Sequence, residues 1–205
     1  GYAPPKPNRG VFNALEDDME IDDAYLGSPG KGLAGRGTDK VPFIVAVNRG
    51  GGGCALRAVA DCSSGSYLEF GSWHLARGAH IRADRSRACG CGLAGWPGLE
   101  QRAFSEEDAD ASLSVAHHLI SNFKSFVLGT FHGITRGYVQ GYMDEFGWRY
   151  CHRADSSMFA SLLSEMLSCP KKARADLAGI FSPQAPQPAA PSKKERSSSL
   201  LAIMR

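Results

Sequence analysis

Three segments in the first third of the chain show the apolar patterns typical of β-strands. Residues 19–27 (MEIDDAYLG) form a short extended pattern that ends at a glycine. Residues 41–47 (VPFIVAV) are apolar and rich in β-branched side chains, as expected of a buried strand. After a glycine-rich turn, residues 54–61 (CALRAVAD) resume an extended pattern. We expect three consecutive strands that pair as antiparallel neighbours.

One short helix and two more strands are predicted in the next part of the chain. Residues 63–78 begin with serines, which favour the start of a helix. Residues 80–84 (HIRAD) have the pattern of a fourth strand, and residues 99–104 (LEQRAF) that of a weaker fifth strand.

The period of the apolar positions then changes to the three-and-four spacing of amphipathic helices. This spacing runs from Leu113 to Val127, and the helix is expected to end at Gly129. A second helix is predicted over 139–150 and a third over 159–166, stopped by Pro170. Three strands, a helix, two strands and three helices together favour one α/β domain.

Length and composition fit a globular domain with many turns. The chain has 205 residues, of which 43% are hydrophobic and 21% charged, with 24 glycines and 11 prolines. No apolar run approaches the roughly 20 residues of a membrane-spanning helix, and no apolar signal segment opens the chain. We therefore expect a cytoplasmic protein whose six cysteines are mostly free thiols.

The two ends differ in composition from the middle. Residues 1–18 are rich in proline and then acidic, which predicts an N-terminal tail. Residues 183–205 are rich in proline, alanine and serine with a basic cluster, which predicts a disordered basic tail. Residues 19–168 are left as the folded domain. The net charge of +2 is too balanced to indicate a nucleic-acid partner by itself.

Three polar positions stand out because of their places in the predicted elements. Asp22 lies in the first strand, Asp84 ends the fourth strand, and Asn122 lies on the first long helix. Strand ends and a facing helix can bring such side chains together, and carboxylate and amide oxygens are ligands that hard divalent cations prefer. Spacing alone leaves open that these residues are solvated or cap the next element.

Two other motifs are weak. Gly30, Gly32 and Gly35 match a dinucleotide-binding pattern, but the residues that follow include more glycine and a proline and do not favour the required helix. Cys89 and Cys91 could bind zinc with residues 151–152, yet the chain has no second pair of cysteines at a typical spacing.

Four segments resemble successive landmarks of one protein family: MEIDDAYLG, HIRAD, HHLISNFKSFVLGTFHG and YMDEFGWRY. They are similar to the ISXO2-like transposase domain of bacterial insertion sequences, which is related to the DDE transposases. The resemblance covers about residues 19–168 and is most specific over 117–153. It implies an RNase H-like fold with a mixed five-stranded sheet flanked by helices, and cutting and joining of DNA at the element's ends with Mg²⁺ or Mn²⁺.

The resemblance also implies roles for the three polar positions, as catalytic residues and as metal ligands. Asp22 would bridge two ions, Asp84 would hold one of them, and Asn122 would complete the other. An amide in the third place carries one negative charge fewer than a carboxylate, which predicts a weaker hold on the second ion.

Several neighbouring residues have two interpretations. Lys124, Arg82, Arg85 and Arg87 could bind DNA phosphates or could be ordinary surface residues. For His117 we favour a packing or surface role over contact with phosphate or with Asn122. Asp23 follows Asp22 and should point to the opposite side of the strand. The partners implied are the terminal repeats, the target DNA and a second copy of the chain in the synaptic complex.

Departures from the family pattern favour an alternative. The family usually has a glycine and aromatic residues after its second aspartate, whereas residues 85–92 here read RSRACGCG. No DNA-reading segment or zinc ribbon is visible before residue 19, so the chain looks like a catalytic domain without its targeting half. The alternative is a truncated, inactive transposase remnant that retains the fold and nonspecific DNA contact. A host nuclease of RNase H-like fold is a third, weaker interpretation.

Overall fold

The computed structural model describes residues 17–27, 40–102, 113–131 and 138–168. The chain divides into two compact units, residues 1–170 and 171–205, and all described residues belong to the first. The predicted basic tail at 183–205 lies outside the described residues, as does the predicted N-terminal tail except for its last two residues. Of those two, Asp18 already belongs to the first strand.

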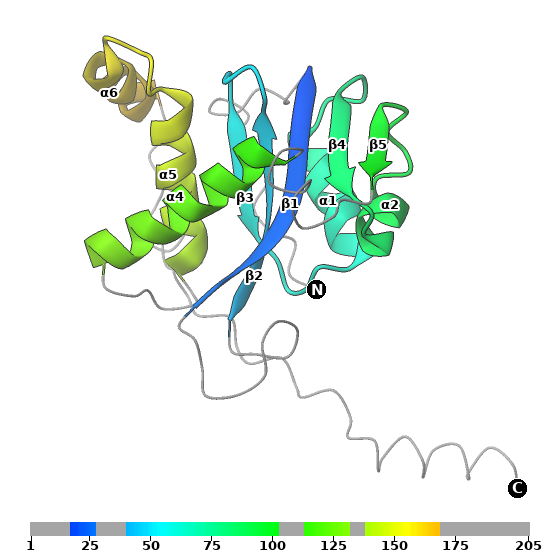
Figure 1. Ribbon diagram of the computed structural model, residues 1–205. Coiled ribbons are helices and arrows are strands. Elements are labelled where there is room, and N and C mark those ends of the chain that lie inside the picture. Colours follow the sequence, from blue (N-terminus) through cyan, green and yellow to red (C-terminus); the bar gives the residue numbers. More distant parts are fainter. Residues whose placement is uncertain (1–16, 28–39, 103–112, 132–137, 169–205) are drawn as a thin grey trace, which may run out of the picture. The chain divides into compact units, whose positions relative to one another are not determined.

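Five strands form one mixed sheet (Figure 1). They are β1 (Asp18–Leu26), β2 (Val41–Asn48), β3 (Cys54–Ala58), β4 (His80–Asp84) and β5 (Leu99–Arg102), in the order β3-β2-β1-β4-β5. The first three strands pair as antiparallel neighbours, as predicted, while β4 runs parallel to β1 and β5 parallel to β4. This is the RNase H-like arrangement that the resemblance implies.

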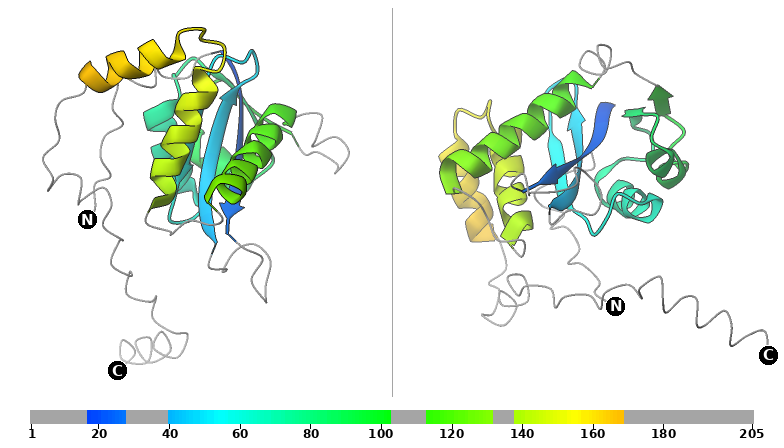
Figure 2. Two further views of the ribbon diagram at one scale, coloured as in Figure 1. Left: turned by 90° about the vertical axis from the view of Figure 1, so that its left-hand side faces the viewer. Right: turned by 60° about the horizontal axis from the view of Figure 1, so that its bottom comes forward.

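Helices cover both faces of the sheet (Figure 2). Helices α1 (Ser64–His74) and α2 (Arg87–Gly92) pack on one face, and α4 (Ser114–Phe131) and α5 (Val139–Cys151) on the other. Strand β2 lies between the two layers, so its side chains are buried on both faces. Its continuous apolar run is the sequence signal of that position.

Helix α4 packs against β1 and β2 through the face that its apolar spacing predicts. The helix was expected to end at Gly129, but it continues to Phe131. The ring of Phe131 packs edge-on against Phe126, with ring centroids 5.4 Å apart, and this contact supports the last turn. A glycine weakens an exposed turn by about 1 kcal/mol, which is too little to end a helix that has such a contact.

Helix α2 was not predicted from the sequence. It has six residues, RACGCG, too few to show a helical period. Gly92 lies so close to α1 that a Cβ atom would come within 2.5 Å of the backbone oxygen of Ser64 and of Cβ of Tyr67. The tight contact between α1 and α2 therefore requires a residue without a side chain at this position.

The last described helix, α6 (Met158–Ser168), contains no buried residue. It begins and ends close to the predicted bounds, and the predicted stop at Pro170 lies outside the described residues. None of the helices in the described ranges is long and apolar enough to cross a membrane.

Candidate active site

The structure brings two of the three predicted site residues to neighbouring places. Parallel pairing of β1 with β4 ends at Ile21 and Ala83, so Asp22 and Asp84 are the next residues along the two strands. Ile21 and Ala83 point into the core beneath α1, and the alternation of side chains places both aspartates on the opposite face. The negative charge of Asp84 is among the causes that raise the pKa of Asp22.

Asp22 is held between its own strand and α4. Its Oδ1 accepts a hydrogen bond from the backbone N–H of Asp23 at 2.8 Å, and its Oδ2 lies 3.4 Å from Nε2 of His117. Burial raises the pKa of Asp22 from 3.8 to about 6, although the Asp23 N–H and His117 act in the opposite direction. A carboxyl group whose charged form is disfavoured in this way, at a site with other carboxylates, would be stabilised in its ionised form by a nearby cation.

His117 therefore lies in the site. The sequence favoured a packing or surface role for this residue, whereas the structure places its ring against Asp22, with 35% of the side chain exposed.

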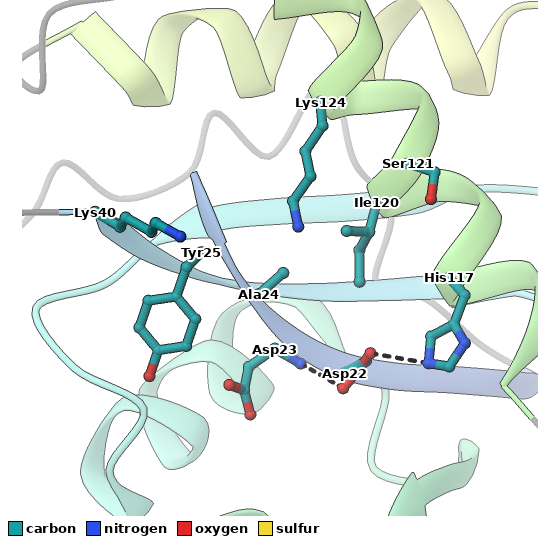
Figure 3. A pocket seen from close by; sticks show the side chains of 9 residues that line it. All are labelled: Asp22, Asp23, Ala24, Tyr25, Lys40, His117, Ile120, Ser121 and Lys124. Atoms are coloured by element: carbon teal, nitrogen blue, oxygen red, sulfur yellow. Dashed lines mark hydrogen bonds and ion pairs between the residues drawn. The ribbon is translucent and has the colours of Figure 1, made fainter. Parts of the chain in front are cut away.

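A pocket of about 360 Å³ opens between β1 and α4 beside these residues (Figure 3). It has the carboxylate of Asp22 on β1 and two lysines, Lys124 on α4 and Lys40 just before β2, and Lys124 extends from the helix toward the strand. The full lining is Asp22, Asp23, Ala24, Tyr25, Lys40, His117, Ile120, Ser121 and Lys124. Such a pocket offers acids for a cation and ammonium groups for an anion side by side.

Asp23 is bound to the other layer of the protein. Its Oδ1 accepts a hydrogen bond of 2.6 Å from the hydroxyl of Tyr67 on α1, as expected for a residue that alternates with Asp22. Cys89 of α2 is also buried nearby, and burial together with the charges of the acidic residues raises the pKa of its thiol to about 12. The thiol of Cys89 is therefore neutral at ordinary pH.

The third predicted ligand, Asn122, is not brought to the pocket. It is exposed on α4 and is absent from the pocket lining, which α4 supplies through four other residues. Successive helical residues are rotated by about 100°, and Asn122 is rotated past Ser121, away from the pocket. Ser121 is the polar residue that α4 presents there one turn after His117. A helical spacing counted from His117 (117, 120, 121, 124) is the sequence signal that identifies this face.

Asp22 and Asp84 are the candidate ligands for a cation among the described residues. Within the described ranges no three His, Cys, Asp or Glu side chains are grouped so as to hold a metal ion. Asp22 and Asp84 nevertheless offer carboxylate oxygens, the ligands that a hard divalent cation prefers. A cation there would favour the ionised form of Asp22, which burial and, to a smaller extent, the charge of Asp84 disfavour. A third carboxylate, which a second ion would use, is not provided by the part of α4 that lines the pocket.

The predicted DNA-binding residues divide into two groups. Arg85 and Arg87 are exposed directly after Asp84, and Lys124 lines the pocket. Arg82 is engaged within the protein, because its Nε donates a hydrogen bond to Oδ1 of Asp18 at 3.1 Å. Three of the four cations thus lie on or beside the elements that carry the acids.

A comparison with models of protein families finds a match to this chain. The sequence model of the ISXO2-like transposase domain matches residues 14–150, which include all five strands and helices α1, α2 and α4. The chain belongs to this family. Membership in the ISXO2-like family connects the chain with the DDE-type transposases. A comparison with curated proteins finds no match.

Solved structures similar to this member of the ISXO2-like family include retroviral proteins. The catalytic core domain of HTLV-2 integrase in complex with magnesium is 11% identical with a TM-score of 0.41, over 67% of this chain and 86% of that one. The simian T-cell lymphotropic virus intasome in complex with the PP2A regulatory subunit B56 gamma is 11% identical with a TM-score of 0.45, over 88% and 60%. The catalytic core of BIV integrase is 9% identical with a TM-score of 0.41, over 74% and 96%.

Proposed function

We propose that this chain is the catalytic domain of a bacterial insertion-sequence transposase, which cuts and joins DNA at the element's ends by metal-dependent phosphoryl transfer. The observation that carries the proposal is the position of Asp22 and Asp84, each one residue past the end of the β1–β4 pairing, in a member of a transposase family. Asp22 also lines a pocket with two lysines.

In this proposal Asp22 and Asp84 hold the divalent cation, Mg²⁺ or Mn²⁺. When bound, such a cation polarises the phosphodiester and lowers the pKa of the attacking water or 3′-hydroxyl. Because the pKa of Asp22 is about 6, this carboxyl is mostly ionised at neutral pH, and a proton competes with the cation only at lower pH. Asn122 remains a ligand predicted by the resemblance alone, and its neighbour Ser121 is one of the residues of α4 that line the pocket.

The cationic residues bind the DNA backbone in this proposal. Lys124 and Lys40 reach a phosphate in the pocket, close to Asp22, and Arg85 and Arg87 extend the contact along the duplex from the end of β4. Arg82 joins them only if its bond to Asp18 opens. The partners are the terminal repeats, the target DNA and a second copy of the chain in the complex that joins the two ends.

A second candidate function is a domain that binds DNA without cutting it. The specific observation in its favour is that α4 presents Ser121, rather than a third carboxylate, to the pocket. A site with two carboxylates holds one cation more readily than two. This candidate corresponds to a decayed transposase that keeps the fold and nonspecific DNA contact.

The test is a cleavage and strand-transfer assay on DNA that carries the element's terminal repeats, with Mg²⁺ or Mn²⁺. We expect metal-dependent products from the full chain and a loss of at least about 100-fold in Asp22→Ala. The matched control is Glu145→Ala, which removes an exposed acid from α5 and should retain activity. DNA binding without any product in the wild-type chain would favour the second candidate, and equal activity in Asp22→Ala would overturn the catalytic assignment.

A further inference from the structure

Glu20 is a carboxylate buried in the sheet, and nothing in the proposed chemistry uses it. None of its surface is exposed, although it lies only two residues before Asp22 on β1. A buried carboxylate is stable only when its oxygens are paired. Both oxygens of Glu20 are paired, since Oε1 accepts a hydrogen bond from Nε of Arg49 and Oε2 accepts one from the backbone N–H of Ala116, each at 2.9 Å.

The bond to Ala116 anchors the beginning of α4. Ala116 lies in the first turn of this helix, where backbone N–H groups lack acceptors within the helix. A negative charge is also favoured at this end of the helix dipole. Glu20 therefore performs the task of a helix cap from a strand 96 residues earlier in the chain.

This anchor is one of two adjacent contacts between β1 and α4. Glu20 and Asp22 alternate onto the same face of the strand, and Ala116 and His117 are consecutive in the helix. Glu20 binds Ala116 at 2.9 Å, and Asp22 faces His117 at 3.4 Å. The first contact is buried and holds the amide of Ala116, the residue directly before His117, against β1.

Arg49 completes the arrangement from the turn after β2. Its side chain binds Glu20 through Nε and Asp18 through Nη1, the latter at 3.1 Å, and its backbone N–H donates to the Asp18 carbonyl at 2.9 Å. The charge of Glu20 is thus neutralised by a residue that is itself held at two points.

We propose that Glu20 is a positioning residue of the active site, which sets the place of His117 and the rest of α4 relative to Asp22 by holding the amide of Ala116. Its burial prevents contact with DNA or with a cation at Asp22. The effect on catalysis rests on the proposed function, whereas the anchoring of α4 is tested separately below.

The two hydrogen bonds of Glu20 suggest variants that keep the size and shape of its side chain. Two donors face Glu20, and a carboxylate offers two acceptor oxygens, whereas the amide in Glu20→Gln offers only one. That variant leaves either Ala116 or Arg49 without an acceptor. Adding Arg49→Gln makes the numbers of donors and acceptors equal again, because Gln places the acceptor Oε1 at the side-chain position where Arg has the donor Nε. In the double variant, the amide of residue 20 donates to residue 49 and still accepts from Ala116.

Amide hydrogen exchange, measured by NMR on the full chain, tests the anchor without any activity. We expect the Ala116 amide to exchange about tenfold faster in Glu20→Gln and to return toward the wild-type rate in the double variant. The ring nitrogen resonances of His117 should shift in the single variant and return in the double one. The control Ile81→Ala disturbs the core on the other face of the sheet and should leave both readings unchanged. Glu20→Met keeps a similar length of side chain and offers an acceptor to neither donor. Wild-type readings at both Ala116 and His117 in a folded Glu20→Met would overturn the proposal.

The terminal-repeat assay tests the effect on catalysis. We expect kcat to fall about 10- to 100-fold in Glu20→Gln with little change in KM for DNA, and the double variant to recover most of the loss. An unchanged kcat in Glu20→Gln together with a displaced His117 would overturn the positioning role. If the wild-type chain cuts no DNA, the proposed function fails, and the Ala116 and His117 measurements alone decide whether Glu20 positions the helix.

Discussion

Nε2 of His117 faces Oδ2 of Asp22 at 3.4 Å across the space between α4 and β1. The other oxygen of the carboxylate, Oδ1, accepts the backbone N–H of Asp23 at 2.8 Å. Oδ2 is therefore the oxygen that His117 and a cation would compete for. The balance between proton, imidazole and metal at this one oxygen gives the site measurable properties.

Replacing Asp22 with Asn should stabilise the metal-free protein. The pKa of Asp22 is about 6 in the folded chain and 3.8 for an ordinary Asp, so ionisation of this residue lowers the free energy of unfolding as the pH rises through this interval. Asn stays neutral at every pH. We expect Asp22→Asn to unfold with a free energy on the order of 2 kcal/mol higher at about pH 8, and the difference to vanish below about pH 4.

Urea unfolding in the presence of a chelator, at several pH values, measures this difference. Asp155→Asn is a suitable control, since Asp155 is an acid whose hydrogen bonds to Ser161 and Ser157 lower its pKa. Asp155→Asn should therefore lower the free energy of unfolding at pH values above the pKa of an ordinary Asp. If Asp22→Asn raises the free energy of unfolding equally at all pH values, ionisation of Asp22 is not the cause of the gain.

Metal binding should strengthen as the pH rises through about 6, because a cation at Asp22 must displace the proton. Calorimetric titration with Mn²⁺ should give an affinity about tenfold lower at about pH 5 than above about pH 7. Asp22→Asn should remove both the tight binding and its pH dependence. Affinity that does not change over this range would mean that Asp22 does not bind the metal.

Most of the fold follows from local patterns in the sequence. The apolar run of β2 and the three-and-four spacing of α4 each show, within the element's own sequence, which of its side chains are buried. Helix α2 was missed because six residues show no period, and the end of α4 was misplaced because the Phe126–Phe131 contact stabilises it. The parallel pairing of β4 with β1 is a long-range arrangement, which local patterns do not specify.

The site could be predicted only in part, because some of its residues are placed by contacts between segments far apart in the sequence. Asp22 and Asp84 lie in elements that local patterns predict, and the parallel pairing of these strands, which ends one residue before each aspartate, brings them to neighbouring places. The face that Asn122 occupies depends on how α4 is rotated against the sheet, and packing of residues such as Phe123 decides that rotation. Glu20 looks like a solvated strand residue in the sequence, since its partner Ala116 is 96 residues away.

The rotation of α4 can be tested with two variants of equal charge. Ser121→Glu adds a carboxylate at the pocket, whereas Asn122→Glu adds it one residue along, on an exposed face. We expect Ser121→Glu to raise the affinity for Mn²⁺ about tenfold or more and Asn122→Glu to leave it nearly unchanged. Calorimetric titration of both variants beside the wild type gives the comparison. The reverse result would support Asn122 as the third ligand, as the resemblance implies, and would contradict the placement of α4.

Lys124 should contribute one phosphate contact to DNA binding, because its ammonium group extends into the pocket beside Asp22. Lys124→Ala should weaken binding of a duplex regardless of its sequence and reduce the slope of log affinity against log salt by about 1. Fluorescence anisotropy at several salt concentrations measures the slope. Arg149→Ala is the matched control, since Arg149 is exposed on α5 and pairs with Glu145 at 2.9 Å. Its removal should leave the slope unchanged, because that cation lies on a helix outside the pocket. Equal slopes for wild type and Lys124→Ala would place the DNA away from the pocket, and the phosphate contact would then have to come from the arginines that follow Asp84.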